Sequence, residues 1–169
     1  MTTLLLVRHG ETVDNANHIM QGQTQGELND NGWCQAEEVA RKLAREKVDA
    51  VVTSDLNRSY DTASVVARYH QLEVITTPLL RERDWGSFTG RYIPDLKDEK
   101  WPSDIETLDH LQQRANDFLG FVTSRFAGCR VVAVGHGIIN KAIQSVFYGL
   151  PMKEVRPMAN CEIRVLELA

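Results

Sequence analysis

The stretch LLLVRHG at residues 4–10 places an apolar run directly before an arginine and a histidine. Four consecutive apolar residues are typical of a strand that is buried on both faces, as the strands of parallel sheets are. The stretch VVAVGHG at residues 131–137 repeats this arrangement, with a glycine on each side of the histidine. The sequence therefore predicts two buried strands, each with a histidine at its carboxyl end.

Outward from these two strands, short apolar runs alternate with longer amphipathic ones. The apolar runs predict five strands, at residues 4–7, 50–53, 73–76, 130–134 and 161–168, the last of them at an edge of the sheet. Helical spacing of apolar residues predicts four helices, at residues 33–45, after a cap at Ser54 or Asp55, at residues 104–126 and at residues 138–147. This alternation predicts an α/β layer fold with a mostly parallel sheet.

Length and composition indicate a single domain over residues 1–169, in which a stretch rich in glycine, proline and aromatic residues forms a short lid at about residues 83–105. Of the 169 residues, 43% are apolar and 25% are charged, which is ordinary for a globular protein. The net charge of −4 gives no support for a nucleic-acid partner. No apolar run approaches the roughly 18 to 20 residues that span a bilayer, and the first residues lack the pattern of a signal peptide, so we expect a cytoplasmic protein with no membrane partner.

Three cysteines, Cys34, Cys129 and Cys161, are widely spaced and form no C-x-x-C pair. Their number is odd, which argues against a disulfide framework. Their spacing argues equally against a zinc site. We therefore expect three free thiols that are buried or half-buried, which agrees with a reducing compartment.

Three sequence segments place phosphate-binding residues at strand ends, where open parallel sheets bind their ligands. Arg8 and His9 follow the first strand, Arg58 lies in the first turn of the helix after the second, and His136 with Gly137 follows the fourth. Arginine forks, helix N-termini and glycine amides all favour a bound phosphate. A neutral imidazole can attack phosphorus to form a phosphohistidine, while arginines and a second histidine stabilise the charge on the phosphoryl oxygens.

An acid for the leaving group is offered by two carboxyl groups, those of Glu82 and Asp84, beside Trp85. A carboxyl group that is buried against apolar side chains has a raised pKa and can hold a proton near neutral pH. Both residues stay candidates for this role. Because His9 and His136 are flanked by glycines and not by a second ligand at metal-binding spacing, we predict neither a metal site nor a cofactor.

Four stretches resemble, in the same order along the chain, the motifs of the histidine phosphatase superfamily, the phosphoglycerate mutase-like proteins: residues 6–12, 54–63, 80–90 and 134–137. The resemblance implies a three-layer α/β/α sandwich, mainly parallel with an antiparallel edge strand. It implies His9 as the phosphorylated nucleophile and Glu82 as the proton donor. It also implies that Arg8, Arg58 and His136 form the phosphate pocket.

The same resemblance implies further pocket residues, because Asn15, Gln21 and Gly22 match positions that line the pocket in the family. The sequence departs from the family just beyond them. Gln25 stands where the family usually has an aspartate, and residues 27–29 read Glu-Leu-Asn instead of Pro-Leu-Thr. This loop borders the substrate.

The short lid favours hydrolysis, because the longer mutases of the family use extra segments to enclose a bisphosphorylated intermediate. We therefore predict a metal-independent phosphomonoester hydrolase, of the histidine acid phosphatase type, that acts through a phosphohistidine on His9. A cofactor-dependent phosphoglycerate mutase is the first alternative, and a non-catalytic protein that binds phosphorylated ligands is the second. The substrate is predicted to be a small phosphoester or a phosphoprotein, and the protein a monomer or a homodimer.

Overall fold

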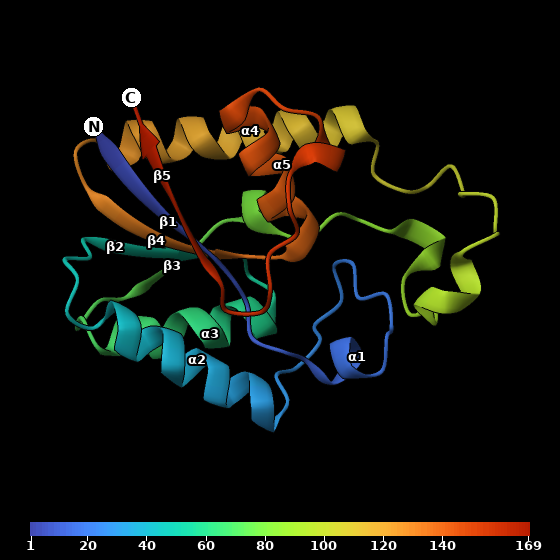
Figure 1. Ribbon diagram of the computed structural model, residues 1–169, viewed down its shortest axis with the longest axis horizontal. Helices are drawn as coiled ribbons and strands as arrows, with labels where there is room; N and C mark the ends of the chain where they lie inside the picture. Colours follow the sequence, from blue (N-terminus) through green and yellow to red (C-terminus); the bar gives the residue numbers. More distant parts are fainter.

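Strand β1 (Thr2–Arg8) lies inside a five-stranded sheet whose order is β3-β2-β4-β1-β5. The computed structural model, which describes residues 1–169, shows a three-layer α/β/α sandwich around this sheet (Figure 1). The other strands are β2 (Ala50–Thr53), β3 (Val74–Thr76), β4 (Arg130–Gly135) and β5 (Ile163–Leu168). Strands β1 to β4 are parallel, and β5 pairs antiparallel with β1 at one edge. The predicted fold class is confirmed.

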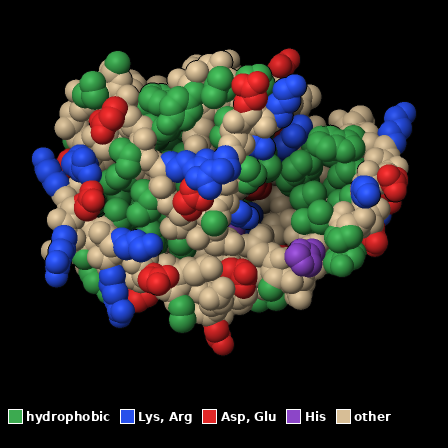
Figure 2. Space-filling model, in the orientation of Figure 1, with side chains coloured by type: hydrophobic (Ala, Val, Ile, Leu, Met, Phe, Trp, Pro, Cys, Tyr) green, Lys and Arg blue, Asp and Glu red, His purple; other side chains and the backbone are tan.

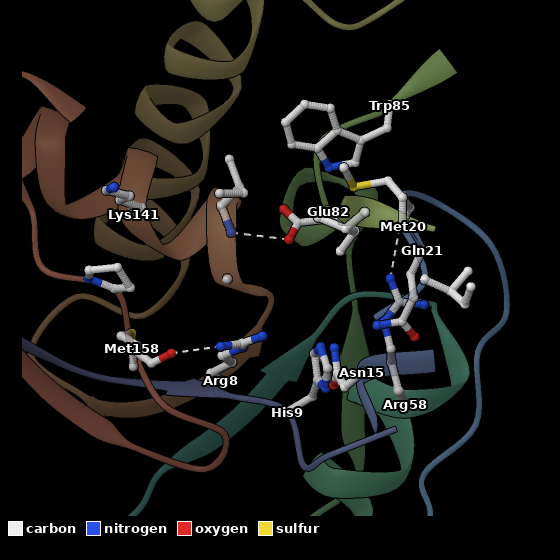
Figure 3. Close-up of a pocket in the computed structure, with 16 residues that line it drawn as sticks. Arg8, His9, Asn15, Met20, Gln21, Arg58, Glu82, Trp85, Lys141 and Met158 are labelled. Carbon is white, nitrogen blue, oxygen red and sulfur yellow. Dashed lines mark hydrogen bonds between the residues drawn. The ribbon is translucent and has the colours of Figure 1, made fainter. Parts of the chain in front are cut away.

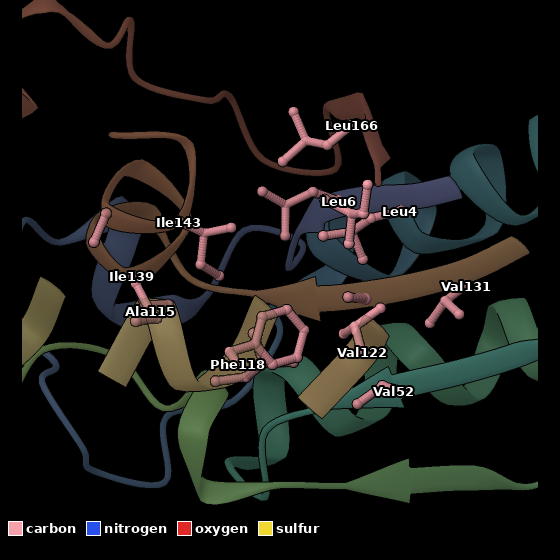
Figure 4. Packing of buried hydrophobic residues seen from close by; sticks show 14 of the residues in the cluster. Leu4, Leu6, Val52, Ala115, Phe118, Val122, Val131, Ile139, Ile143 and Leu166 are labelled. Carbon is pink, nitrogen blue, oxygen red and sulfur yellow. The ribbon is translucent and has the colours of Figure 1, made fainter. Parts of the chain in front are cut away.

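Two hydrophobic clusters form because successive side chains of a strand point to opposite faces of the sheet. Leu4 and Leu6 face helices α4 (Leu108–Arg125) and α5 (Gly137–Tyr148), in the cluster that Figure 4 shows. On the other face, Leu5 and Val7 pack against α2 (Asp30–Leu43) and α3 (Asn57–Arg68). A fully buried leucine contributes about 1.5–3 kcal/mol. The unbroken apolar run of β1 thus fits a strand that is covered on both faces.

The register between β1 and β4 brings the two histidines together. Arg8 lies opposite Gly135 in this parallel pair of strands. His9 and His136 are the next residues after β1 and β4, so they follow the two strands side by side. The backbone N–H of His9 donates to the carbonyl of Gly135 at 3.1 Å, which extends the pairing to the strand ends.

Three local predictions were wrong, two because a side chain has a partner distant in sequence and one because of a backbone conformation. Helix α4 begins at Leu108 and not at residue 104, because Asp104 accepts a bond from the backbone of Ser87 in the lid. Helix α3 has no side-chain cap, because the hydroxyl of Ser54 faces His136 instead. Strand β5 begins at Ile163, because the backbone of Cys161 is left-handed, with φ 59°.

A short helix, α1 (Val13–Ala16), was not predicted. A capping box starts it, in which the Thr12 side chain accepts from the Asn15 backbone and the Asn15 side chain accepts from the Thr12 backbone. The box bends the chain away from β1 and towards the lid. None of the helices combines the length and apolar character that crossing a bilayer requires.

The lid at residues 83–105 is irregular, as predicted, with two short 3₁₀ turns at Gly86–Phe88 and Ile93–Leu96. It has its own small core of Phe88, Leu96 and Ile105, which is separate from the two clusters on the sheet. Backbone bonds join the lid to the loop after α1, from Gly90 to the carbonyl of Met20 at 2.7 Å and from Met20 to the carbonyl of Arg91 at 2.9 Å. The two segments therefore form one lobe, at the right of Figure 1.

Candidate active site

A cavity of about 300 Å³ lies at the carboxyl ends of the parallel strands. Figure 2 shows a hollow on this face, with basic side chains inside it, between the sandwich and the lobe that carries the lid. Most of the predicted site residues line this cavity: Arg8, His9, Asn15, Gln21, Gly22, Arg58, Glu82 and Gly137. Figure 3 shows Arg8 and Arg58 on either side of His9, with Glu82 across from them.

His9 is held as a neutral imidazole with one free ring nitrogen. Its side chain is only 2% exposed, and its Nδ1 lies 2.6 Å from the carbonyl oxygen of Gly10. Since a carbonyl can only accept, Nδ1 carries the proton and Nε2 keeps its lone pair. Burial, together with the charges of Arg58 and Arg8, lowers the pKa of His9 well below its ordinary value. His9 therefore holds a ring nitrogen with a free lone pair, and its surroundings disfavour protonation of the ring.

His136 lies behind His9 and does not itself line the cavity. It is fully buried, and the two ring centres are 5.0 Å apart at an angle of 59°. Its Nε2 lies 2.8 Å from the hydroxyl of Ser54, whereas its Nδ1 has no partner in the protein. Burial and the nearby charges of Arg58 and Arg8 lower the pKa of His136 well below its ordinary value.

The sequence did not predict the contact of Ser54 with His136, because it indicated Ser54 or Asp55 as a helix cap. The Ser54 oxygen accepts the backbone N–H of Leu56 at 3.3 Å, which leaves its hydroxyl hydrogen for Nε2 of His136. That arrangement puts the imidazole proton on Nδ1, the unpartnered nitrogen. The position of Ser54 at the end of β2 was the signal that could have identified it.

Arg58 is the more deeply buried of the two arginines, at 1% exposure. Its terminal nitrogens donate to the carbonyls of Thr24 and Gly22, at 2.5 and 2.7 Å, and Nε has no partner. Gly22 has φ +54°, a left-handed conformation that glycine adopts without strain. Burial lowers the pKa of Arg58 to about 10, against the opposing charges of Glu82 and Asp14.

Arg8 completes the cationic side of the cavity. Its Nη1 donates to the carbonyl of Met158 at 2.7 Å, and its Nε has no partner. Burial lowers the pKa of Arg8, while the charge of Glu82 opposes this. Met158 comes from the segment before β5, a contribution that no sequence motif indicated.

Glu82 has polar surroundings, which differ from the apolar ones predicted from its neighbour Trp85. Its carboxylate accepts backbone N–H groups of Ile138 and Ile139 at the start of α5, each at 3.0 Å, and of Arg83 at 2.8 Å. The other candidate acid, Asp84, lies outside the cavity. Its carboxylate accepts from the backbone of Gly86, and it lines a second cavity whose side chains are mostly charged or polar. The geometry therefore favours Glu82 over Asp84 as the acid.

The remaining predicted residues shape the cavity from the loop around α1. The Gln21 side chain accepts the hydroxyl of Thr12 at 2.9 Å, and Asn15 lies beside His9 (Figure 3). Gly137 lies close to Arg8, whose guanidinium carbon would be 3.5 Å from a Cβ added at this glycine.

The outer wall of the cavity is mostly apolar, with one cation. Its apolar residues are Ile19, Met20, Trp85, Ile93, Ile138, Pro157 and Met158. Lys141, on the second turn of α5, is the cation, and sequence analysis did not identify it. Trp85 lines the cavity, whereas Trp101 packs against Trp85 from behind with ring centres 5.5 Å apart. No group of three or more His, Cys, Asp or Glu side chains is arranged to hold a metal ion.

Comparisons with known proteins find phosphatases and probable mutases that are similar to this chain. A metal-independent phosphoserine phosphatase of Arabidopsis thaliana is 36% identical over 160 residues, covering 85% of this chain and 67% of that protein. A probable phosphoglycerate mutase of Photorhabdus laumondii is 32% identical, and the match covers 96% of this chain and 83% of that protein. The solved structure of a mycobacterial glucosyl-3-phosphoglycerate phosphatase with VO3 is 26% identical, with a TM-score of 0.89 and coverage of 98% and 92%.

The family and its phosphatase members support the assignment of this chain as a phosphoric monoester hydrolase. The family model of the histidine phosphatase superfamily (branch 1) matches residues 4–169. The resemblance that the four motifs indicated is confirmed, and the chain belongs to this superfamily.

Proposed function

We propose that the protein hydrolyses small phosphomonoesters without a metal, through a phosphohistidine on His9. One observation carries this proposal. Three buried nitrogens around His9, Nε of Arg8, Nε of Arg58 and Nδ1 of His136, have no partner within the protein. Buried polar groups are nearly always hydrogen-bonded, and a phosphoryl group between them would accept from all three.

In the first step, Nε2 of His9 attacks phosphorus and the bond from phosphorus to the ester oxygen breaks. Arg8, Arg58 and His136 stabilise the negative charge on the three equatorial oxygens. Glu82 gives its proton to the departing oxygen, so the leaving group is a neutral alcohol.

In the second step, water attacks the phosphohistidine. The carboxylate of Glu82 takes a proton from the water, the nitrogen–phosphorus bond breaks, and inorganic phosphate leaves. His9 and Glu82 return to their starting states. The sum is one ester and one water converted to one alcohol and one phosphate.

The outer wall of the cavity supports a substrate that is small and carries a second anionic group. Its apolar residues fit the carbon skeleton of a leaving group, and Lys141 offers a cation beyond the phosphate-binding arginines. Among the relatives, one is named for phosphoserine and another for glucosyl-3-phosphoglycerate. A phosphomonoester with a carboxylate near the ester oxygen would satisfy both the arginines and Lys141.

A phosphoglycerate mutase is the second candidate, since several similar proteins carry that name as a probable function. A mutase must keep the phosphohistidine from water until the phosphate returns to the substrate. The lid here is a single short segment with a core of only three buried residues, Phe88, Leu96 and Ile105. That limited cover favours hydrolysis.

The test is to measure inorganic phosphate released in the presence of a chelator from an aryl phosphate, phosphoserine and 3-phosphoglycerate. The His9→Ala protein is the blank, and rapid acid-free quenching tests for a base-stable phosphoenzyme. Release that depends on His9 supports the hydrolase. Conversion of 3-phosphoglycerate to its 2-isomer with little free phosphate identifies the mutase. If the protein binds vanadate but produces neither phosphate nor the isomer, the proposal of catalysis is wrong.

A further inference from the structure

Outside the cavity, a buried ion pair joins the lid to helix α4. Glu106 and Arg114 are 5% and 11% exposed, and their side chains meet in a fork, with Nη2 to Oε1 at 2.8 Å and Nε to Oε2 at 3.0 Å. Burial alone would raise the pKa of Glu106, but hydrogen bonds from Arg114, the Asp84 backbone and His110 hold it below its ordinary value. Neither residue of the pair lines the catalytic cavity.

The remaining donors of Arg114 all go to the main chain around Glu82. Nη1 donates to the carbonyls of Leu79 and Arg81, at 3.0 and 2.6 Å, and Nη2 approaches the carbonyl of Glu82 at 3.4 Å. A guanidinium can serve so many acceptors because it is planar and has five N–H groups. Residues 79 to 82 are thereby fixed against α4.

Glu106 fixes the same segment on the far side of Glu82. Its carboxylate accepts the N–H of Asp84 at 3.0 Å, and its own backbone N–H donates to the carbonyl of Asp84 at 2.9 Å. The backbone of Glu82 is therefore held before and after the residue by one ion pair. Its carboxylate is held separately by the amides of α5.

We propose that Arg114 and Glu106 are positioning residues that hold Glu82 at the distance from which it donates its proton to the leaving oxygen. The inference rests on the proposed role of Glu82 as that acid. A buried ion pair adds little net stability compared with apolar residues of the same size, but it fixes geometry. A displacement of about 1 Å at a catalytic group can cost about 100-fold in rate.

The dependence of kcat/KM on the leaving group distinguishes a loss of acid catalysis from a general loss of structure. A general acid matters most for esters with a poor leaving group and little for a good one. We compare kcat/KM for an alkyl phosphate, glycerol 1-phosphate, with kcat/KM for p-nitrophenyl phosphate in the same preparation. The ratio of the two does not depend on the fraction of folded protein, so partial unfolding cannot imitate the effect.

The variants are Arg114→Met with Glu106→Gln, which removes both charges together, and Arg114→Lys, which keeps the charge but loses the fork. Each is expected to lower the alkyl-to-aryl ratio by about 10- to 100-fold. His110→Ala is the matched control, because His110 contacts Oε2 of Glu106 but no carbonyl near Glu82. Its ratio is expected to equal that of the wild type.

Glu82→Gln and Asp84→Asn are measured alongside. If Glu82→Gln lowers the ratio but the double variant and Arg114→Lys do not, the positioning role is wrong while the acid stands. If Glu82→Gln leaves the ratio unchanged, the acid assignment fails and this inference falls with it. A lowered ratio in Asp84→Asn alone would give the acid role to that residue.

Discussion

Acid should destabilise the ligand-free protein steeply, because His9 and His136 stay neutral while the chain is folded. Burial, with the charges of Arg58 and Arg8, lowers the pKa of both imidazoles well below the ordinary value. In the unfolded chain each pKa returns to about 6.5. Below that pH the unfolded state binds two protons that the folded state does not, so stability is complete above about pH 7 and is lost as the pH falls through 6.5.

The size of the loss follows from the two histidines. A pKa difference contributes about 1.4 kcal/mol per pH unit once the unfolded chain is protonated. Integrated from pH 7.5 to pH 5, each histidine takes away at most about 2 kcal/mol, and the two together at most about 4 kcal/mol. Domains have total stabilities of about 5–15 kcal/mol, so this is a large part of the whole.

Urea unfolding, followed by circular dichroism at pH 7.5, 6.5, 5.5 and 5, measures the loss directly. His9→Gln and His136→Gln each remove one of the two titrating groups, so each variant is expected to lose up to about 2 kcal/mol less than the wild type. All other ionisable groups are common to the proteins and cancel in the difference. His18→Gln, at an exposed position, is the matched control.

A wild-type stability that is flat from pH 7.5 to pH 5 would refute the reasoning. So would variants that lose as much stability in acid as the wild type does. Either result would mean that the folded protein protonates these imidazoles, and that the nucleophile is not held neutral by its surroundings.

Three further predictions follow from single contacts. Ser54→Ala should lower kcat about 10-fold on p-nitrophenyl phosphate, since a buried hydrogen bond to His136 is lost, and Ser54→Thr should retain most of it. Arg58→Met should raise the inhibition constant for inorganic phosphate by about 10- to 100-fold, because a charge-assisted contact is removed; an unchanged constant would contradict the assignment. Burial raises the pKa of the Cys161 thiol to about 12, so iodoacetamide at pH 8 should label exposed Cys34 and leave Cys161 unmodified by mass spectrometry.

The fold could be predicted because the apolar runs in the sequence show which strands are buried on both faces. Residues 4–7 are apolar on both faces, and the structure covers both faces with helices. The start of α4 could not be predicted, because Asp104 is a good helix-capping residue by type and yet its carboxylate accepts from Ser87. Local propensity does not include a partner 17 residues away along the chain.

Site residues could be predicted where the reactive side chains are adjacent in the sequence, as Arg8 and His9 are. It was not predictable where the chemistry depends on a contact between motifs. The neighbouring Trp85 predicted apolar surroundings for Glu82, but its carboxylate accepts from backbone amides of α5, 56 residues further along the chain. Lys141 gave no signal at all, because one lysine on an amphipathic helix is usually a solvated residue.

The buried site explains why catalysis and stability oppose each other in this chain. A histidine that stays neutral in acid remains a nucleophile below the ordinary pKa of an imidazole, and the same burial makes the folded protein less stable there. Arg58, buried with an unpartnered nitrogen, adds an unsatisfied group to the same place. A bound oxyanion satisfies all of these groups at once, and anything that binds only the folded state stabilises it. Phosphate should therefore protect the wild type against acid and lose that effect in Arg58→Met, since the residues that bind the anion are the ones whose burial weakens the free protein.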